Sequence, residues 1–219
     1  MIDLHTHTIF SDGELIPSEL ARRASVKGYR VIGISDHVDA SNMEQVITSL
    51  LRLREEMEYY ENITIVPGVE ITHVPPRLVP VLIERARRMG VLYVVIHGET
   101  IVEPVQEGTN RAAIEGGCDI LAHPGLIKPA DVAFAAERGV LLEITARRGH
   151  SLTNGHVARL ARDAGAKLVY NTDAHAPSDL TPEVEARRIV LGAGLIPDDF
   201  LHMQQNAFDL VKRVAGAAR

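Results

Sequence analysis

Residues 90–97, Gly-Val-Leu-Tyr-Val-Val-Ile-His, contain the structural unit that recurs along this chain. Gly90 follows a segment with helical spacing, and glycine is the residue that most often ends a helix in the left-handed conformation. The next six residues, 91–96, are a short apolar run rich in β-branched side chains, which predicts a buried strand. His97 stands where that strand should end. The stretch predicts a helix, a turn, a strand and a polar residue at the strand's C-terminal end.

The same unit can be followed outward in both directions. Gly28, Gly116, Gly139 and Gly165 also separate a helical segment from a strand-like run, and each predicts a helix C-terminus. Apolar runs predict strands at residues 2–4, 31–35, 63–66, 91–96, 120–122, 140–144 and 167–170. Helical spacing predicts helices at residues 18–27, 43–60, 78–89, 111–115, 130–138, 157–164 and 182–191, followed by a pair of short C-terminal helices.

Strands and helices therefore alternate, which favours parallel strands joined by crossover helices. About seven such units predict an α/β fold, a single-domain (β/α)7 barrel of the TIM-like kind over residues 1–219. An open doubly wound sheet is the alternative. The chain has 219 residues, enough for one sizeable core, and no Pro/Ser-rich linker marks a second domain.

Composition narrows the function classes. No apolar run approaches the roughly 20 residues of a membrane span, and the N-terminus enters a strand-like run directly, so we expect a cytoplasmic protein without a membrane partner. Cys118 is the only cysteine, which excludes an intramolecular disulfide. The net charge of −6 disfavours broad capture of nucleic acid, whose affinity comes mainly from Lys and Arg. The oligomeric state stays open.

Six of the ten histidines lie at or just beyond the C-terminal end of a predicted strand. Because these ends converge on one face of a β/α barrel, residues remote in sequence should meet there. One such histidine alone would more often be a surface or hydrogen-bonded residue, but so many clustered imidazoles would be costly to bury without a metal. The six are His5, His7, His37, His97, His123 and His175.

Spacing and nearby carboxylates strengthen the prediction of a metal site. His5 and His7 are two residues apart, so a strand would point both to one side, and Asp173 and His175 share that spacing. Glu70 and Asp12 add carboxylate oxygens after the third and first predicted strands. Mixed imidazole and carboxylate ligands suit Zn, Mn or Fe(II), and the lack of thiols nearby favours a catalytic site with open positions.

The ordered motifs resemble the polymerase and histidinol phosphatase (PHP) family of metal-dependent phosphoesterases. The resemblance implies a distorted seven-stranded β/α barrel with two or three divalent ions, often Zn, Mn or Fe. The matching motifs are Asp3-Leu4-His5-Thr6-His7-Thr8, Ser11-Asp12-Gly13, Ile34-Ser35-Asp36-His37, Pro67-Gly68-Val69-Glu70, Ile96-His97, Ala122-His123-Pro124, Leu142-Glu143-Ile144 and Thr172-Asp173-Ala174-His175.

The resemblance also implies a distribution of ligands among the ions. Glu70 becomes a bridge between the first two ions. A two-metal site is the alternative, because members of the family vary at the position of Asp12. Asp3 and Asp36 are either acceptors that orient ligand imidazoles or caps of turns. The first ion would take His5, His7, Glu70 and Asp173, the second Glu70, His97 and His123, and the third Asp12, His37 and His175.

The resemblance implies a phosphoric ester hydrolase, a histidinol-phosphatase-like phosphatase that would hydrolyse a small phosphomonoester with a metal-bridging water. Arg147, Arg148 and His150 after the sixth strand are candidates for binding phosphate, with Arg147 also a candidate catalytic group, and Lys128 is a weaker candidate. For each of these four residues, the alternative is an exposed position in a solvated loop with no contact to phosphate. The alternative functions are a nuclease like the PHP modules of polymerases, a non-catalytic subunit of an RNA-processing complex, and metal-dependent C–N hydrolysis.

Overall fold

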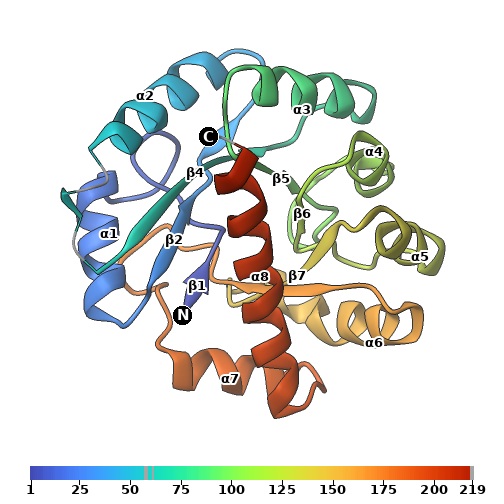
Figure 1. The fold of residues 1–219 in the computed structure, drawn as a ribbon. Helices are drawn as coiled ribbons and strands as arrows, with labels where there is room; N and C mark the ends of the chain where they lie inside the picture. Colours follow the sequence, from blue (N-terminus) through green and yellow to red (C-terminus); the bar gives the residue numbers. More distant parts are fainter. Residues whose placement is uncertain (57–58, 61, 218–219) are drawn as a thin grey trace.

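The computed structural model describes residues 1–56, 59–60 and 62–217, and within them the chain folds into a nearly closed barrel of seven parallel strands (Figure 1). The strand order is β1-β2-β4-β5-β6-β7-β8, with the short β3 pairing with β4. This confirms the predicted barrel over the open sheet. The strands are β1 (Ile2–Asp3), β2 (Val31–Ile34), β3 (His37–Val38), β4 (Thr64–Ile71), β5 (Tyr93–His97), β6 (Ile120–Ala122), β7 (Leu141–Thr145) and β8 (Leu168–Asn171).

Helices surround the barrel and cover its outer face (Figure 1). Prolines open several of them, at the first helical turn where a missing N–H costs nothing. No helix of the described residues is long and apolar enough to cross a membrane. The helices are α1 (Pro17–Val26), α2 (Met43–Glu55), α3 (Val79–Arg88), α4 (Thr109–Gly116), α5 (Pro129–Arg138), α6 (Asn154–Ala164), α7 (Glu183–Gly192) and α8 (Pro197–Ala217), with short 3-10 turns η2 (Pro76–Leu78) and η3 (His150–Thr153).

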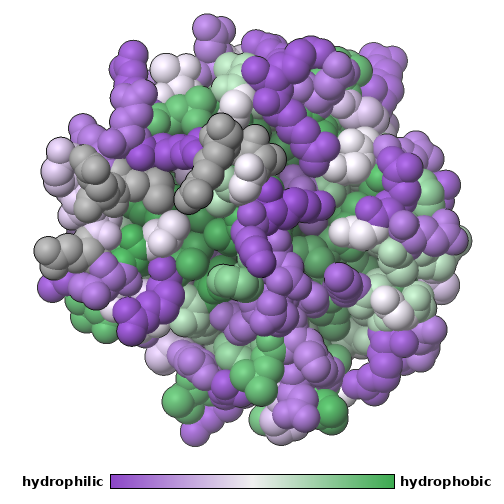
Figure 2. All heavy atoms as spheres, viewed as in Figure 1, coloured by the Kyte–Doolittle hydropathy of each residue, from purple (hydrophilic) through white to green (hydrophobic). Residues whose placement is uncertain are grey.

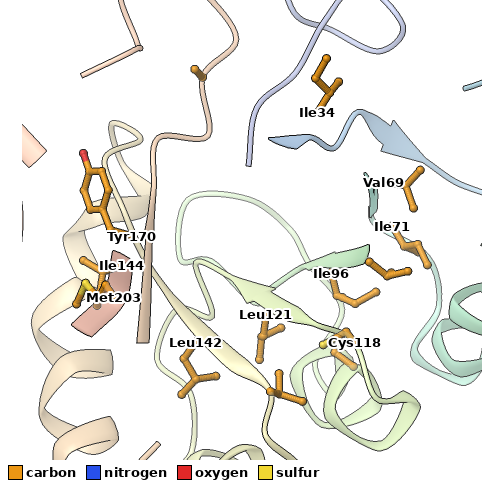
Figure 3. Packing of buried hydrophobic residues seen from close by; sticks show 14 of the residues in the cluster. Ile34, Val69, Ile71, Ile96, Cys118, Leu121, Leu142, Ile144, Tyr170 and Met203 are labelled. Carbon is orange, nitrogen blue, oxygen red and sulfur yellow. The ribbon is translucent and has the colours of Figure 1, made fainter. Parts of the chain in front are cut away.

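Strand alternation divides the core into two layers. In β5, Val94 and Ile96 belong to the large cluster between strands and helices, part of which is drawn in Figure 3. Tyr93 and Val95 point the other way, into the barrel interior. The same period of two places His97, the next residue in that series, on the interior side. The barrel interior is therefore filled by apolar side chains along the strands, and polar side chains such as His97 enter it at the C-terminal ends of the strands.

Tyr93 on β5 explains one glycine on β2 and one on β4. Its ring lies across the barrel interior, and its hydroxyl donates a hydrogen bond to the carbonyl oxygen of Leu4 at 2.8 Å. A Cβ atom on Gly68 would lie 2.3 Å from this ring, and one on Gly33 would lie 2.3 Å from its hydroxyl oxygen. Gly68, inside the Pro-Gly-Val-Glu motif, is therefore required by packing directly below the site.

The barrel closes at the seam between β1 and β8. Past the end of β1, Thr6 forms a single parallel bridge with Ala174, and the N–H of His7 donates to the carbonyl oxygen of Ala174 at 2.9 Å. The side chain of Asn171 accepts a hydrogen bond from the N–H of Leu4 at 2.9 Å. Two motif segments that carry four of the predicted ligands are thus the segments that close the barrel.

Helix α8 closes the opposite, N-terminal end of the barrel, and both Figure 1 and Figure 2 are drawn from this side. Gln204 exchanges two hydrogen bonds with the backbone of Ile2, and Arg213 pairs with Asp119 at 2.7 Å. Ala207 and Leu210 fill the barrel from below. The face drawn in Figure 2, on which hydrophilic and hydrophobic residues are mixed, is therefore the face away from the predicted ligands.

Several predicted boundaries were wrong. The C-terminal segment is one helix, α8, because its apolar positions run unbroken at helical spacing, and α2 ends at Glu55 instead of residue 60, with residues 57–58 outside the described part. Strand β4 continues past Val66 through Pro67 and Gly68, which strand propensity disfavours. Gly117, with φ 71°, caps α4 in place of Gly116.

Candidate metal centre

The bridge that closes the barrel positions four predicted ligands. Residues on either side of a bridged pair point away from the bridged side chains and toward one common side of the strands. His5 and His7 flank one bridged residue, and Asp173 and His175 flank the other. The Nε2 atom of His7 lies 3.2 Å from Oδ1 of Asp173, and Nε2 of His5 lies 3.6 Å from the same oxygen. The spacing predicted this convergence.

Glu70 occupies the middle of the cluster. It lies on β4 one residue before that strand ends, is fully buried, and points into the barrel. Its Oε1 lies 3.2 Å from Nε2 of His5 and 3.8 Å from Nε2 of His123. Its Oε2 lies 3.7 Å from Nε2 of His7 and 2.7 Å from Nδ1 of His37. The two carboxylate oxygens thus face different histidines, which is the arrangement that a bridging ligand needs.

The structure also brings together the other two predicted sets. Glu70, His97 and His123 each offer one ligating atom within 4.8 Å of the others. Oδ1 of Asp12 lies 3.2 Å from Nε2 of His175 and 3.6 Å from Nε2 of His37. Asp12 is the most exposed member, with 60% of its side chain accessible, so it is the candidate ligand least fixed by packing.

Strand ends bend sharply at this site. His73, His123 and Asp173 have φ values of 54°, 25° and 52°, in the left-handed region that residues other than glycine rarely adopt. His123 and Asp173 follow β6 and β8. Such strain is retained where the surrounding structure requires a particular side-chain direction, as at functional sites.

The unpaired buried atoms fit a metal cluster. Among the described residues, eight buried side-chain nitrogen and oxygen atoms lack a hydrogen-bond partner, and seven of them belong to predicted ligands. Buried polar atoms are normally paired, so this concentration requires an additional partner. A divalent cation satisfies imidazole and carboxylate lone pairs together. The seven are Nε2 of His5, both ring nitrogens of His7, Oε1 of Glu70, Nδ1 of His97, Nδ1 of His123 and Oδ1 of Asp173.

The pKa shifts divide the candidate ligands. For His5, His37 and His97 burial lowers the pKa, but neighbouring carboxylates raise it above the ordinary value for histidine, whereas other candidates are held in the form that binds metal. Burial, together with neighbouring imidazoles, holds the pKa of His7 and of His123 well below the ordinary value for histidine. Burial opposes ionisation of Glu70, yet the nearby His5 and His37 bring its pKa well below the ordinary value. Neutral imidazole and ionised carboxylate are the forms that bind metal. Burial raises the pKa of Asp173 to about 6, so its ionisation would favour metal binding as the pH rises.

A fully buried carboxylate, Glu143 on β7, supports the cluster from below. Its Oε2 lies 2.8 Å from Nδ1 of His5 and accepts a hydrogen bond from the side chain of Asn171 at 2.8 Å. Its Oε1 accepts from the N–H of His123 at 3.3 Å. A carboxylate on one ring nitrogen fixes the imidazole and leaves the other nitrogen free for a metal.

Asp3 and Asp36, the two carboxylates that the sequence suggested for this supporting role, hold backbone and hydroxyl groups instead. Asp3 accepts from the N–H of His5 and from Thr172. Asp36 accepts from Thr8 and Ser11. Of the two predicted roles, orienting ligand imidazoles or capping turns, the structure supports the capping of turns for both residues.

Changing Glu143 to glutamine should weaken metal binding by about 10- to 100-fold, because a neutral amide orients His5 less strongly. Chelator competition measures the affinity directly. Glu137→Gln on the exposed face of α5 is the matched control and should bind metal like the wild type. Wild-type affinity in Glu143→Gln would show that this carboxylate has no supporting role.

A cavity of about 430 Å³ opens beside the cluster and contains some of the predicted substrate contacts. Arg147 and His150 line it. Arg147 pairs with Asp179 at 3.1 Å, and Nδ1 of His150 lies 2.7 Å from the hydroxyl of Thr100.

Two other predicted phosphate contacts lie outside this cavity lining. Arg148 is exposed and does not line the cavity. Lys128 pairs with Glu107 at 2.8 Å in a separate, smaller cavity of about 200 Å³. The structure therefore brings Arg147 and His150 to the cluster and leaves Arg148 and Lys128 apart from it.

Sequence reasoning assigned no role to Glu143 or Glu103. Glu143 stands in a quoted motif at the end of a predicted strand, so its position was a usable signal. Glu103 lies in the loop between β5 and α4, where no local pattern marks it. It lines the cavity together with His73, which follows β4.

Comparison with known proteins agrees with this geometry. Residues 3–146 match the model of the PHP domain. The chain is 46% identical over 218 residues to the uncharacterized protein MJ1295 of Methanocaldococcus jannaschii, covering 97% of this chain and 99% of that protein. It is 28% identical over 218 residues to the probable phosphatase Teth514_1060 of Thermoanaerobacter sp. (strain X514), covering 90% and 88% of the two chains.

A solved structure shares the fold. It is the histidinol phosphate phosphatase of Lactococcus lactis subsp. lactis Il1403 in complex with zinc, L-histidinol and phosphate. The TM-score is 0.58 at 17% identity, with 89% of this chain and 94% of that chain covered. At this identity the likeness shows a common fold and no more.

Proposed function

The chain belongs to the PHP domain family, and on this premise we propose that it is a metal-dependent phosphatase that hydrolyses a small phosphomonoester. The observation that carries the proposal is the cluster of buried, unpaired imidazole and carboxylate atoms beside an open cavity. The relative named as a probable phosphatase and the structural neighbour that holds zinc, L-histidinol and phosphate support the same class of reaction.

We propose two or three divalent transition-metal ions, Zn, Mn or Fe, held by the nine predicted ligands. His5, His7, Glu70 and Asp173 would hold one, Glu70 with His97 and His123 a second, and Asp12, His37 and His175 a third. When bound, such ions lower the pKa of water and neutralise charge on a phosphoryl group.

The protein's own part of the reaction is binding and orientation. Buried Glu70 keeps two groups of histidines at a fixed separation, and Glu143 holds His5 in place from below. At the cavity, the guanidinium of Arg147 is in position to bind phosphate oxygens, with Asp179 fixing its direction. His150, whose Nδ1 lies 2.7 Å from the hydroxyl of Thr100, places its Nε2 at the same cavity, 3.3 Å from Oε1 of Glu103.

Arg147→Ala should lower kcat/KM for a phosphomonoester by about 10- to 100-fold, the size expected for lost hydrogen bonds to a charged group. Metal content should be unchanged, because Arg147 is not among the ligands. Steady-state kinetics and elemental analysis on the same sample check both statements. Arg148→Ala, a change at the exposed neighbour, is the control, and equal kinetics for both variants and the wild type would remove Arg147 from the phosphate site.

The proposed function is tested by measuring phosphate release from a panel of small phosphomonoesters with Mn, Zn and Fe(II) supplied separately. The same preparations receive single-stranded DNA and RNA. We expect phosphate release from at least one monoester and little action on the nucleic acids, given the net charge of −6. Removal of nucleotides from DNA or RNA ends with every monoester untouched would favour the nuclease alternative and overturn the proposal.

A further inference from the structure

Helix α8 crosses the N-terminal end of the barrel, and its outer face is exposed to solvent (Figure 1). Leu201 and Phe208 are 53% and 50% exposed on this face although both are large and apolar. Residues three, four and seven positions apart lie on one side of a helix, so the exposed side chains of α8 form a single stripe. We call it the outer stripe, and it consists of Asp198, Leu201, Gln205, Phe208 and Lys212.

The outer stripe is symmetric about Gln205, with the sign of the charge reversed between its two ends. Asp198 lies seven residues before Gln205 and Lys212 lies seven residues after it, about 10 Å away in each direction along the helix. Leu201 lies four residues before Gln205 and Phe208 three residues after it. A second stripe that runs antiparallel, related by a two-fold axis at Gln205, would place Asp198 opposite the partner's Lys212 and Leu201 against the partner's Phe208.

The two edges of the stripe also match themselves under this rotation. Leu201 and Phe208 lie on one edge, and the exposed His202 and Asp209 lie on the other. A two-fold axis perpendicular to both helices keeps each edge on its own side, so the apolar edges of two copies would meet. On the polar edge, His202 would face the partner's Asp209, an imidazole beside a carboxylate.

The charges favour a second copy over other occupants of this face. In the described part of the chain, the only ion pair of α8 joins Arg213 to Asp119, so Asp198 and Lys212 are left to pair outside their own chain. A parallel arrangement would place like charges together. An anionic membrane attracts an excess of Lys and Arg, whereas the outer stripe has one charge of each sign.

We propose that the outer stripe of α8 joins two copies of this chain base to base, as antiparallel helices around a two-fold axis at Gln205. The predicted ligands lie at the other end of each barrel, so both cavities stay open in the dimer. One helix face per copy is a small interface, typical of transient contacts, so we expect a Kd on the order of 10 µM. The proposal involves neither metal nor substrate, and it is therefore independent of the proposed function.

Sedimentation velocity of the full chain, from about 1 µM to about 500 µM, measures the association. The wild type should change from monomer to dimer over this range. Phe208→Ala should raise the Kd at least about tenfold, because an aromatic side chain near the centre of an interface contributes much of its affinity and the two-fold axis counts the loss twice.

Charge reversal tests the antiparallel register. Asp198→Lys places a lysine opposite the partner's Lys212 at both ends of the interface, and Lys212→Asp places two carboxylates there. Each variant alone should dimerise about tenfold more weakly than the wild type, the size expected when two exposed attractive pairs become repulsive. An equimolar mixture of the two variants should recover wild-type affinity as a heterodimer, because every facing pair again has opposite charges.

Glu44→Lys is the matched control, since Glu44 is an exposed acidic residue in the first turn of α2, as Asp198 is in the first turn of α8. It should dimerise like the wild type. A wild type that stays monomeric throughout would overturn the proposal and leave the outer stripe to a different protein. A dimer whose Kd none of the three stripe variants changes would also overturn it, and a mixture no tighter than its two components would exclude the antiparallel pairing. Circular dichroism of each variant verifies that the helix content is retained.

Discussion

Glu70→Gln should lower turnover on the order of 10³-fold or more and release at least one metal ion. The change is nearly isosteric, but the amide has no negative charge to share between two cations. It also offers an N–H₂ group where the carboxylate now presents an oxygen to either His5 or His7. Steady-state kinetics with elemental analysis of the same preparation measures both effects.

Two observations separate this prediction from a loss of fold. The packing around β4 is unchanged by the substitution, so the circular dichroism spectrum should resemble that of the wild type. Glu19→Gln on the surface of α1, where Glu19 pairs with Arg23, is the matched control and should keep full turnover and metal. A Glu70→Gln protein with full metal and near-normal turnover would exclude a bridging role for Glu70.

Removing the metal with a chelator should abolish phosphomonoester hydrolysis and lower Tm. Each ion bound at about 100 times its Kd stabilises the fold by about 2.7 kcal/mol, which corresponds to a fall of about 5–11 °C for a domain of this size. The physical reason is the set of buried imidazole and carboxylate atoms that have no other partner. Calorimetry of chelated and metal-reloaded protein gives the shift, and activity should return on reloading.

The matched control for metal removal is the same treatment of Glu70→Gln, whose Tm should respond less because fewer ions are bound. An equal response in both proteins would show that the chelator acts on something other than the ions at Glu70. Full activity in thoroughly chelated wild type would exclude metal-dependent catalysis.

Sequence reasoning predicted the barrel because about seven short β-branched runs alternate with helical segments, a pattern typical of parallel strands joined by crossover helices. It placed the candidate ligands at strand ends because parallel strands meet at one face, and the structure brings Glu70 and His97 there from β4 and β5. Side chains alternate along β5, so Tyr93 and Val95 lie inside the barrel. The same alternation predicts that the side chain of His97 also points inward.

Loops and long-range contacts could not be predicted in the same way. Glu103 meets His73 across 30 residues of sequence, and no local pattern encodes that contact. Lys128 follows a ligand motif, yet the loop carries it away to Glu107. Strand β4 runs through Pro67 and Gly68 because Tyr93 packs against that glycine, a tertiary effect that overrides local preference.

The most direct test of the central claim is a titration of metal-free protein with Mn or Zn while phosphate release from the best small phosphomonoester is followed. We predict little release after the first equivalent per chain and a steep rise as the second is bound, because Glu70 joins two groups of ligands. Full phosphate release with one equivalent, or with none, would contradict the multinuclear phosphatase.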